Sequence, residues 1–318
     1  MRTIDIHAHT VPQCFQKDVL NNRKWHNMTS AEGELFNPRV NWTPAERILE
    51  MDSMGMDVQV VSTNVFFYKY NENLTTAIAI ARDCNNELHQ MTMDYPERLA
   101  GLATIPMQDI DAAINEMERA VVTLGFKGVM IDDSVNGHTY DEPEFLPFWK
   151  AAEQMGAFVL IHQAYPTIVT DRINRYHLAN SIGNLADRTI TFAAMVFGGV
   201  MDKCPDLKIC LCHGGGYTCY GIGRMDRGWQ VRPEASANIS APPSSYLRRF
   251  YYDCLTQSES SLRYLIDTVG ADRVVLGTDW PADMCIDWPV SWVQNLDSLT
   301  REEKDMILWK NLEGLLGL

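Results

Sequence analysis

Short apolar runs recur along the whole chain, and longer segments of mixed polarity separate them. Eight such runs lie at residues 3–6, 57–63, 100–105, 127–131, 157–161, 207–212, 249–253 and 273–277. Most are rich in valine, isoleucine and leucine and do not alternate strictly with polar residues. This pattern is typical of parallel strands that are covered on both faces.

The segments between these runs have the spacing of amphipathic helices. Residues 45–55, 110–125 and 258–270 carry apolar side chains at helical intervals, and each segment ends in a glycine shortly before the next run. Glycine at that point is a common signal for the end of a helix. Strand–helix alternation repeated eight times predicts an α/β fold, a (β/α)₈ barrel, rather than an open sheet. We expect a single barrel domain over residues 1–318, with an insertion at about residues 12–43.

Composition and charge narrow the classes of function. Aspartate and glutamate number 41 and lysine and arginine 27, so the formal net charge is −14. A chain this acidic is poorly suited to nucleic acid or to an anionic membrane surface. No apolar run approaches the ~18 residues that cross a bilayer, and the N-terminal residues lack the apolar stretch of a signal peptide. The eight cysteines include no C-x-x-C pair and are interpreted as reduced thiols, which favours a cytoplasmic protein.

Histidines gather at the ends of the predicted strands. His7 and His9 are two residues apart in the first strand, so both imidazoles can face one metal ion. His162, His213 and Asp279 end the fifth, sixth and eighth apolar runs. Barrel active sites are built at this carboxyl-terminal face. Imidazoles with one carboxylate suit Zn²⁺ and also Mn²⁺ or Fe²⁺ as ligands. The alternative to a metal site is that these histidines are core residues with hydrogen-bond partners.

The same residues carry a resemblance to a known family. The chain has H-x-H after the first strand, histidine after the fifth, H-G-G-G at residues 213–216 and T-D-W-P at residues 278–281. With L-G-F-K-G at residues 124–128 and G-R-M-D at residues 223–226, these motifs resemble the amidohydrolase superfamily. Within it, the chain is most similar to the branch of 2-amino-3-carboxymuconate-6-semialdehyde decarboxylase, and the resemblance covers nearly the whole chain.

The resemblance assigns roles to individual residues. It implies one divalent metal ion held by four ligands, His7, His9, His162 and Asp279. Zinc is the first expectation for this ion. His213 matches the histidine that acts as acid and base beside the metal-activated water, and Asp279 is expected to assist proton transfer.

The resemblance also implies a set of substrate-binding arginines. Arg47 matches an arginine that binds a substrate carboxylate, and Arg232 matches a further arginine near the site. Arg224 matches an arginine that enters the active site of the neighbouring subunit, so the resemblance implies a homodimer.

The chain departs from this branch in the expected pocket wall. After His162 it reads Gln163-Ala164-Tyr165-Pro166 instead of Pro-Trp-Asp, and after Asp279 it reads Trp280-Pro281-Ala282-Asp283 instead of Tyr-Pro-Phe-Pro. Asn180 stands where the branch has a tryptophan. The metal chemistry is therefore better supported than the identity of the substrate.

Two further groups need an interpretation. Asp132 and Asp133 end the fourth run, where metal centres with two ions obtain a bridging ligand, so either residue is a candidate for a second metal ion. Cys212 precedes His213, and strict alternation along a strand predicts that its side chain packs outward against the helices.

These observations favour a metal-dependent, oxygen-independent decarboxylase of a small unsaturated or aromatic carboxylic acid. A hydrolase or hydratase of a related ring-cleavage product uses the same residues and stays open, and release of CO₂ distinguishes the two. A non-catalytic metal-binding scaffold is the remaining alternative. It needs neither His213 nor the arginines.

Overall fold

The computed structural model describes residues 2–29, 39, 42–164 and 172–318. Eight strands form one sheet in which every hydrogen-bonded neighbour is parallel and the spatial order follows the chain. They are β1 (Ile4–Thr10), β2 (Val58–Thr63), β3 (Leu99–Thr104), β4 (Gly128–Ile131), β5 (Phe158–Ile161), β6 (Lys208–Leu211), β7 (Tyr251–Asp253) and β8 (Val274–Val275).

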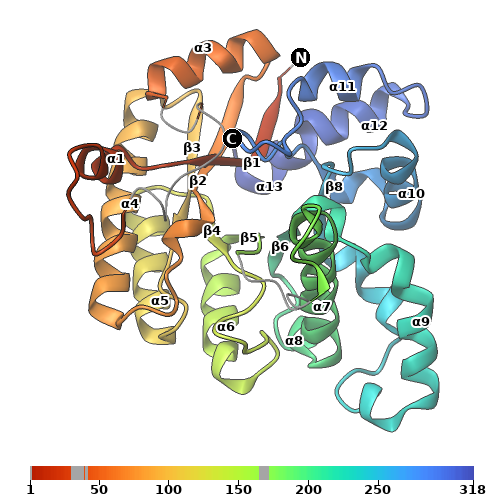
Figure 1. The fold of residues 1–318 in the computed structure, drawn as a ribbon. Helices are drawn as coiled ribbons and strands as arrows, with labels where there is room; N and C mark the ends of the chain where they lie inside the picture. Colours follow the sequence, from red (N-terminus) through yellow and green to blue (C-terminus); the bar gives the residue numbers. More distant parts are fainter. Residues whose placement is uncertain (1, 30–38, 40–41, 165–171) are drawn as a thin grey trace.

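Backbone hydrogen bonds close the sheet on itself. The N–H of Ile6 in β1 donates to the carbonyl of Leu276 (3.0 Å), and the N–H of His9 donates to the carbonyl of Trp280 (2.7 Å). The segment that follows β8 therefore lies against β1, and the helices surround the strands (Figure 1). The predicted (β/α)₈ barrel is confirmed.

Helices follow the strands along the chain, and the three that were predicted are present. In the segment 110–125, a π-helical turn at Arg119–Thr123 continues the α-helix. The α-helices are α1 (Gln13–Leu20), α3 (Pro44–Met54), α4 (Leu74–Asp94), α5 (Ile110–Glu118), α6 (Leu146–Met155), α7 (Leu185–Phe197), α8 (Val200–Lys203), α9 (Thr218–Val231), α10 (Glu259–Val269), α11 (Pro289–Gln294), α12 (Arg301–Asp305) and α13 (Asn311–Leu316). No helix in the described ranges has the length and apolar character needed to cross a membrane.

Local sequence explains where these helices begin and end. At α3, the side chain of Thr43 accepts from the N–H of Glu46, and the Glu46 carboxylate accepts from the N–H of Thr43. This capping box satisfies donors that the first turn leaves unpaired. Gly55 follows α3 with φ 71°, a conformation that glycine adopts without strain.

The core lies inside the barrel and between the strands and the helices. Every residue of β2, β3, β4 and β5 is buried, as expected for parallel strands covered on both faces. A small separate cluster, which includes Phe15, Trp25 and Phe67, packs under the segment after β1. The predicted insertion at residues 12–43 falls partly on residues 30–38 and 40–41, outside the described residues.

Candidate metal centre and its cavity

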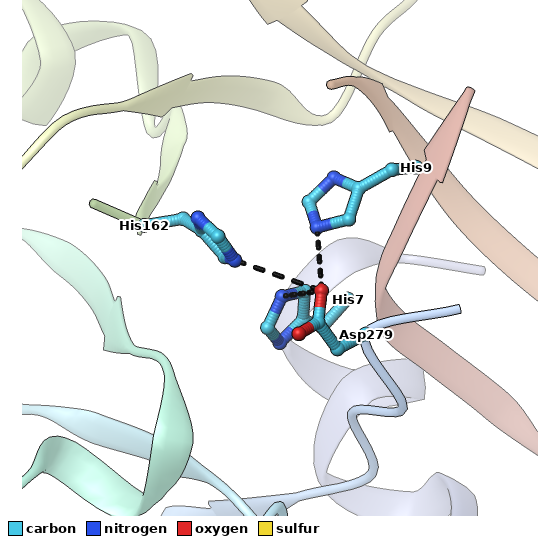
Figure 2. A group of neighbouring side chains, drawn as sticks. All are labelled: His7, His9, His162 and Asp279. Atoms are coloured by element: carbon cyan, nitrogen blue, oxygen red, sulfur yellow. Dashed lines mark hydrogen bonds and ion pairs between the residues drawn. The ribbon is translucent and has the colours of Figure 1, made fainter. Parts of the chain in front are cut away.

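Four side chains converge at the carboxyl ends of the strands. His7 and His9 lie on β1, His162 directly follows β5, and Asp279 follows β8. The Oδ1 atom of Asp279 lies 3.3 Å from Nε2 of His7, 3.1 Å from Nε2 of His9 and 3.7 Å from Nε2 of His162. Figure 2 shows the three imidazoles turned toward this carboxylate. One ligand atom from each residue lies within 4.8 Å of the others, so the four predicted ligands surround one point.

Each of the three imidazoles is oriented by a hydrogen bond at its other nitrogen. Nδ1 of His7 lies 2.7 Å from the Asp253 carboxylate, Nδ1 of His9 lies 3.0 Å from the Ser62 hydroxyl, and Nδ1 of His162 lies 3.0 Å from the Gln163 carbonyl. A carboxylate and a carbonyl only accept hydrogen bonds, so Nδ1 of His7 and Nδ1 of His162 carry the proton. Their Nε2 lone pairs are therefore free for a metal ion.

The orphaned Nε2 atoms show that a metal ion fits. Nε2 of His7 and Nε2 of His162 are buried without a hydrogen-bond partner. Burial lowers the pKa of His9, and it lowers that of His162 well below the usual value, so both imidazoles are neutral near pH 7. Burial alone would raise the pKa of Asp279, but the facing histidines hold it well below its usual value. Neutral imidazoles at His9 and His162, together with an ionised Asp279, have the protonation states that a divalent cation requires. Burial opposes the charged form of His7, but the facing Cys212 and Asp279 raise its pKa well above the usual value, so a cation that binds there displaces a proton.

Two of these supporting residues, Asp253 and Ser62, were not predicted. Asp253 is the last residue of β7 and is completely buried, and its carboxylate also accepts from the N–H of Gly214 (2.8 Å). Its place at a strand end was a signal in the sequence. Ser62 lies within β2, and nothing in the sequence separates it from other small residues of the strands.

His213 stands beside the four converging side chains. Its Nε2 lies 3.6 Å from Oδ2 of Asp279, and its ring centre lies 5.1 Å from that of His162. His213 has φ 56° and Asp279 has φ 60°, so both side chains leave the backbone at sharp turns just past a strand. His213 does not belong to the group that could hold the ion, which agrees with its predicted separate role.

A cavity of about 720 Å³ opens from this centre. Among the described residues its lining includes Asp279 as the only carboxylate, and no lysine or arginine. Asn180, where the related branch has tryptophan, lies in this wall, whereas Tyr165 and Pro166 lie outside the described residues. The lining residues are Asn180, Ser181, Asn184, Leu185, His213, Gly214, Gly216, Tyr217, Cys219, Tyr220, Leu255, Thr256, Gln257, Ser260, Ser261, Tyr264, Leu265, Asp279 and Met284.

The three predicted arginines do not line this cavity in their own chain. Arg47 is buried; its guanidinium donates to the Gln59 side chain (2.8 Å) and to the carbonyl of His9, and lies 4.2 Å from the ring centre of Trp280. Arg224 is exposed on α9.

Arg232 follows α9 at the surface and pairs with Glu234 at 2.7 Å. Within one chain it is therefore not placed beside the metal centre, where the resemblance puts a further arginine. The substrate-binding roles of all three arginines stay predictions.

Asp132 and Asp133 have partners other than a metal ion. A carboxylate oxygen of Asp133 lies 2.7 Å from both the buried guanidinium of Arg188 and the hydroxyl of Thr191. The Asp132 carboxylate accepts from the N–H of Asp133 and of Ala164. Within the described part of the chain, neither aspartate joins a group with metal-ligand geometry.

The prediction for Cys212 is wrong. Its sulfur lies within 4.8 Å of ligand atoms of His7 and Asp253, so it faces the barrel interior and not the helices. Alternation holds only while a strand continues. Here β6 ends at Leu211 and Cys212 keeps an extended backbone (φ −63°, ψ 163°), whereas the positive φ of His213 breaks the alternation, so that both side chains lie on the same side. Burial raises the pKa of the Cys212 thiol, which is unfavourable for a nucleophile.

Comparisons with known proteins agree with this geometry. The chain is 30% identical over 329 residues to 2-amino-3-carboxymuconate-6-semialdehyde decarboxylase of Dictyostelium discoideum, covering 99% of this chain and 91% of the relative. It is 30% identical over 291 residues to gamma-resorcylate decarboxylase of Rhizobium sp. (strain MTP-10005), covering 86% of each chain.

A solved structure supports the fold. The dihydroxybenzoic acid decarboxylase of Polaromonas sp. JS666, with bound manganese and the inhibitor 2-nitroresorcinol, superposes with a TM-score of 0.85 at 24% identity. The match covers 100% of this chain and 97% of that one. The family model described as Amidohydrolase matches residues 4–318. This chain therefore belongs to the amidohydrolase family.

Proposed function

We propose that this chain is a metal-dependent, oxygen-independent decarboxylase of a small unsaturated or aromatic carboxylic acid. One observation carries the proposal: Asp279, which belongs to the group of four converging side chains, and His213 both line one cavity. Among its described lining residues this cavity has no carboxylate besides Asp279 and no basic side chain besides His213. Its volume of about 720 Å³ lies within the range of small-molecule sites. The decarboxylase relatives support this choice over other reactions.

A divalent cation would be held by His7, His9, His162 and Asp279. When bound, it supplies Lewis acidity toward a carboxylate or water oxygen. We propose zinc because three imidazole nitrogens and one carboxylate oxygen suit it. The same ligands suit manganese, which the Polaromonas enzyme binds, so both metals belong in the test.

His213 is placed to move the proton. Its Nε2 faces Oδ2 of Asp279 at 3.6 Å, and the same imidazole lines the cavity. In the proposed step, Nε2 gives its proton to the substrate carbon that carries the carboxylate. The bond from that carbon to the carboxylate then breaks, its electron pair restores the conjugated system, and CO₂ leaves. The Asp279 carboxylate stabilises the imidazolium before the transfer.

Arg224 is proposed to act between subunits. The cavity lacks a cation of its own chain among its described lining residues, whereas Arg224 is exposed on α9. Tyr217 and Tyr220 on the same stretch are 36% and 87% exposed, which supports a protein contact there. We propose a homodimer in which Arg224 enters the neighbouring cavity and, with Arg47, binds a substrate carboxylate bidentately. Arg232 is proposed to lie near that shared site.

The test is a carbon balance. Metal-loaded protein is incubated with 2,6-dihydroxybenzoate, 5-carboxyvanillate and 2-amino-3-carboxymuconate-6-semialdehyde, and both released CO₂ and product mass are measured. We expect at least one substrate to give CO₂ in equal amount to a product that is lighter by one CO₂. His213→Ala is the control. A product that keeps every carbon and gains water would establish a hydratase or hydrolase, and tight metal binding without turnover of any compound would favour the scaffold.

A further inference from the structure

One amide oxygen of a residue in the cavity wall is buried without a hydrogen-bond donor. Asn184 ends the π-helical segment Ala179–Asn184, directly before α7, and is only 3% exposed. Its Oδ1 is buried and accepts no hydrogen bond. Asn184 is one of the residues that line the cavity, together with His213 and Asp279. A buried acceptor without a donor is unfavourable for folding, so its presence here needs a functional explanation.

The position of Asn184 is fixed relative to His213. The glycine run after His213 packs against the start of α7: a Cβ on Gly216 would lie 2.1 Å from the carbonyl oxygen of Leu185. The N–H of Tyr217 also donates to the hydroxyl of Thr189 in α7 (2.9 Å). The segments that carry His213 and Asn184 are therefore in direct contact, and both residues line one cavity.

The surroundings of Asn184 limit what it can bind. Thr256 and Gln257 add neutral polar groups to the lining, and Leu265 and Met284 add apolar surface suited to the face of a ring. The described lining residues include no lysine or arginine. An acceptor oxygen in this setting disfavours a second carboxylate and favours a neutral donor such as a hydroxyl group.

We propose that Asn184 is a specificity-determining residue that accepts a hydrogen bond from a hydroxyl group on the substrate ring. The proposal rests on the proposed function, because it takes the cavity as the site of an aromatic acid. An analogue without the hydroxyl group leaves Oδ1 unpaired, so it binds more weakly than the hydroxy compound. A hydroxyl group ortho or para to the carboxylate also donates electron density, which assists protonation of the carboxylate-bearing ring carbon by His213. The same substituent is therefore both recognised and chemically useful.

The test measures binding rather than turnover. Dissociation constants of 2-, 3- and 4-hydroxybenzoate and of the matching fluorobenzoates are measured by calorimetry on metal-loaded protein. Fluorine on the ring is small and cannot donate a hydrogen bond. We expect at least one hydroxybenzoate to bind about tenfold more tightly than its fluoro counterpart. Asn184→Leu should reduce that ratio to about twofold or less, whereas Asn184→Asp, which keeps an acceptor, should retain it.

The control is Ser181→Ala, because Ser181 lines the same wall but its hydroxyl already donates to the carbonyl of His177. This variant should keep the wild-type ratio. Unchanged preference in Asn184→Leu, or equal binding of all three pairs by wild type, would overturn the proposal and leave Asn184 as a binding site for water only. If the preference for a hydroxybenzoate depends on Asn184 but no compound releases CO₂, the proposed decarboxylase activity is refuted. The proposed hydrogen bond from a ring hydroxyl to Asn184 would still stand. If Asn184→Leu fails to fold, the ratio in Asn184→Ala decides.

Discussion

The hydrogen bond between Asp253 and His7 makes a prediction about metal affinity. Asp253 is completely buried; one carboxylate oxygen lies 2.7 Å from Nδ1 of His7, and the other accepts from the N–H groups of Gly214 (2.8 Å) and Leu255 (3.2 Å). In Asp253→Asn, the amide oxygen keeps the two backbone donors, and the amide nitrogen then faces His7. Because that nitrogen donates, the proton of His7 moves from Nδ1 to Nε2, where it blocks the lone pair needed by the metal ion.

The expected effect follows from what such supporting residues contribute elsewhere. Loss of a carboxylate partner of a metal-bound histidine costs about 10- to 100-fold in metal affinity, or about 1.4–2.7 kcal/mol. We expect Asp253→Asn to fall in this range in a zinc competition assay with a fluorescent chelator.

The matched control is Ser62→Ala, since Ser62 is a neutral partner of His9 at 3.0 Å. It should weaken binding by less than about tenfold. Thermal unfolding of the metal-free variants separates a binding defect from a folding defect. Wild-type zinc affinity in Asp253→Asn, or an equal loss in Ser62→Ala, would refute the reasoning.

Three further predictions concern other parts of the molecule. His213→Ala should retain the metal ion, measured by elemental analysis, and lose about 10²–10⁴-fold in turnover; loss of the metal would make His213 a ligand. Mixing inactive Arg224→Ala and His213→Ala subunits should restore activity, and hybrids that form without activity would contradict a shared site. Burial raises the pKa of Asp132 from 3.8 to about 7, so the protonated carboxyl contributes stability that is fully present below pH 3.8 and is lost as the pH rises to about 7. The free energy of unfolding, measured with urea, should therefore fall less between about pH 5 and pH 8 in Asp132→Asn than in wild type, with a difference of at most about 3 kcal/mol. The same fall in both proteins would contradict this prediction.

The pattern of the sequence predicted the barrel and the convergence of the ligands because both depend on strand ends. His162 and Asp279 follow apolar runs, and parallel strands bring such ends to one face whatever the helices do. Period-two spacing likewise predicts a common direction for His7 and His9.

The predictions fail where the strand geometry stops. Cys212 and His213 lie past the end of β6, where a positive φ replaces alternation, and sequence pattern does not show that turn. Arg47 illustrates a second limit. Its contacts with Gln59 and with the carbonyl of His9 depend on how α3 packs against β1 and β2, which is a property of three elements together.

The seam between β1 and the segment after β8 has a consequence for biosynthesis. The backbone bond from the N–H of Asp279 to the carbonyl of His7 (2.8 Å) joins the two ends of the barrel at the same place where their side chains converge. During synthesis, the two histidines of β1 leave the ribosome about 270 residues before the carboxylate that completes their site. A growing chain therefore holds an incomplete set of ligands until the eighth strand has been made. Tight metal binding is thus a late event that requires closure of the whole barrel. A chain truncated before Asp279 would lose both tight metal binding and barrel closure.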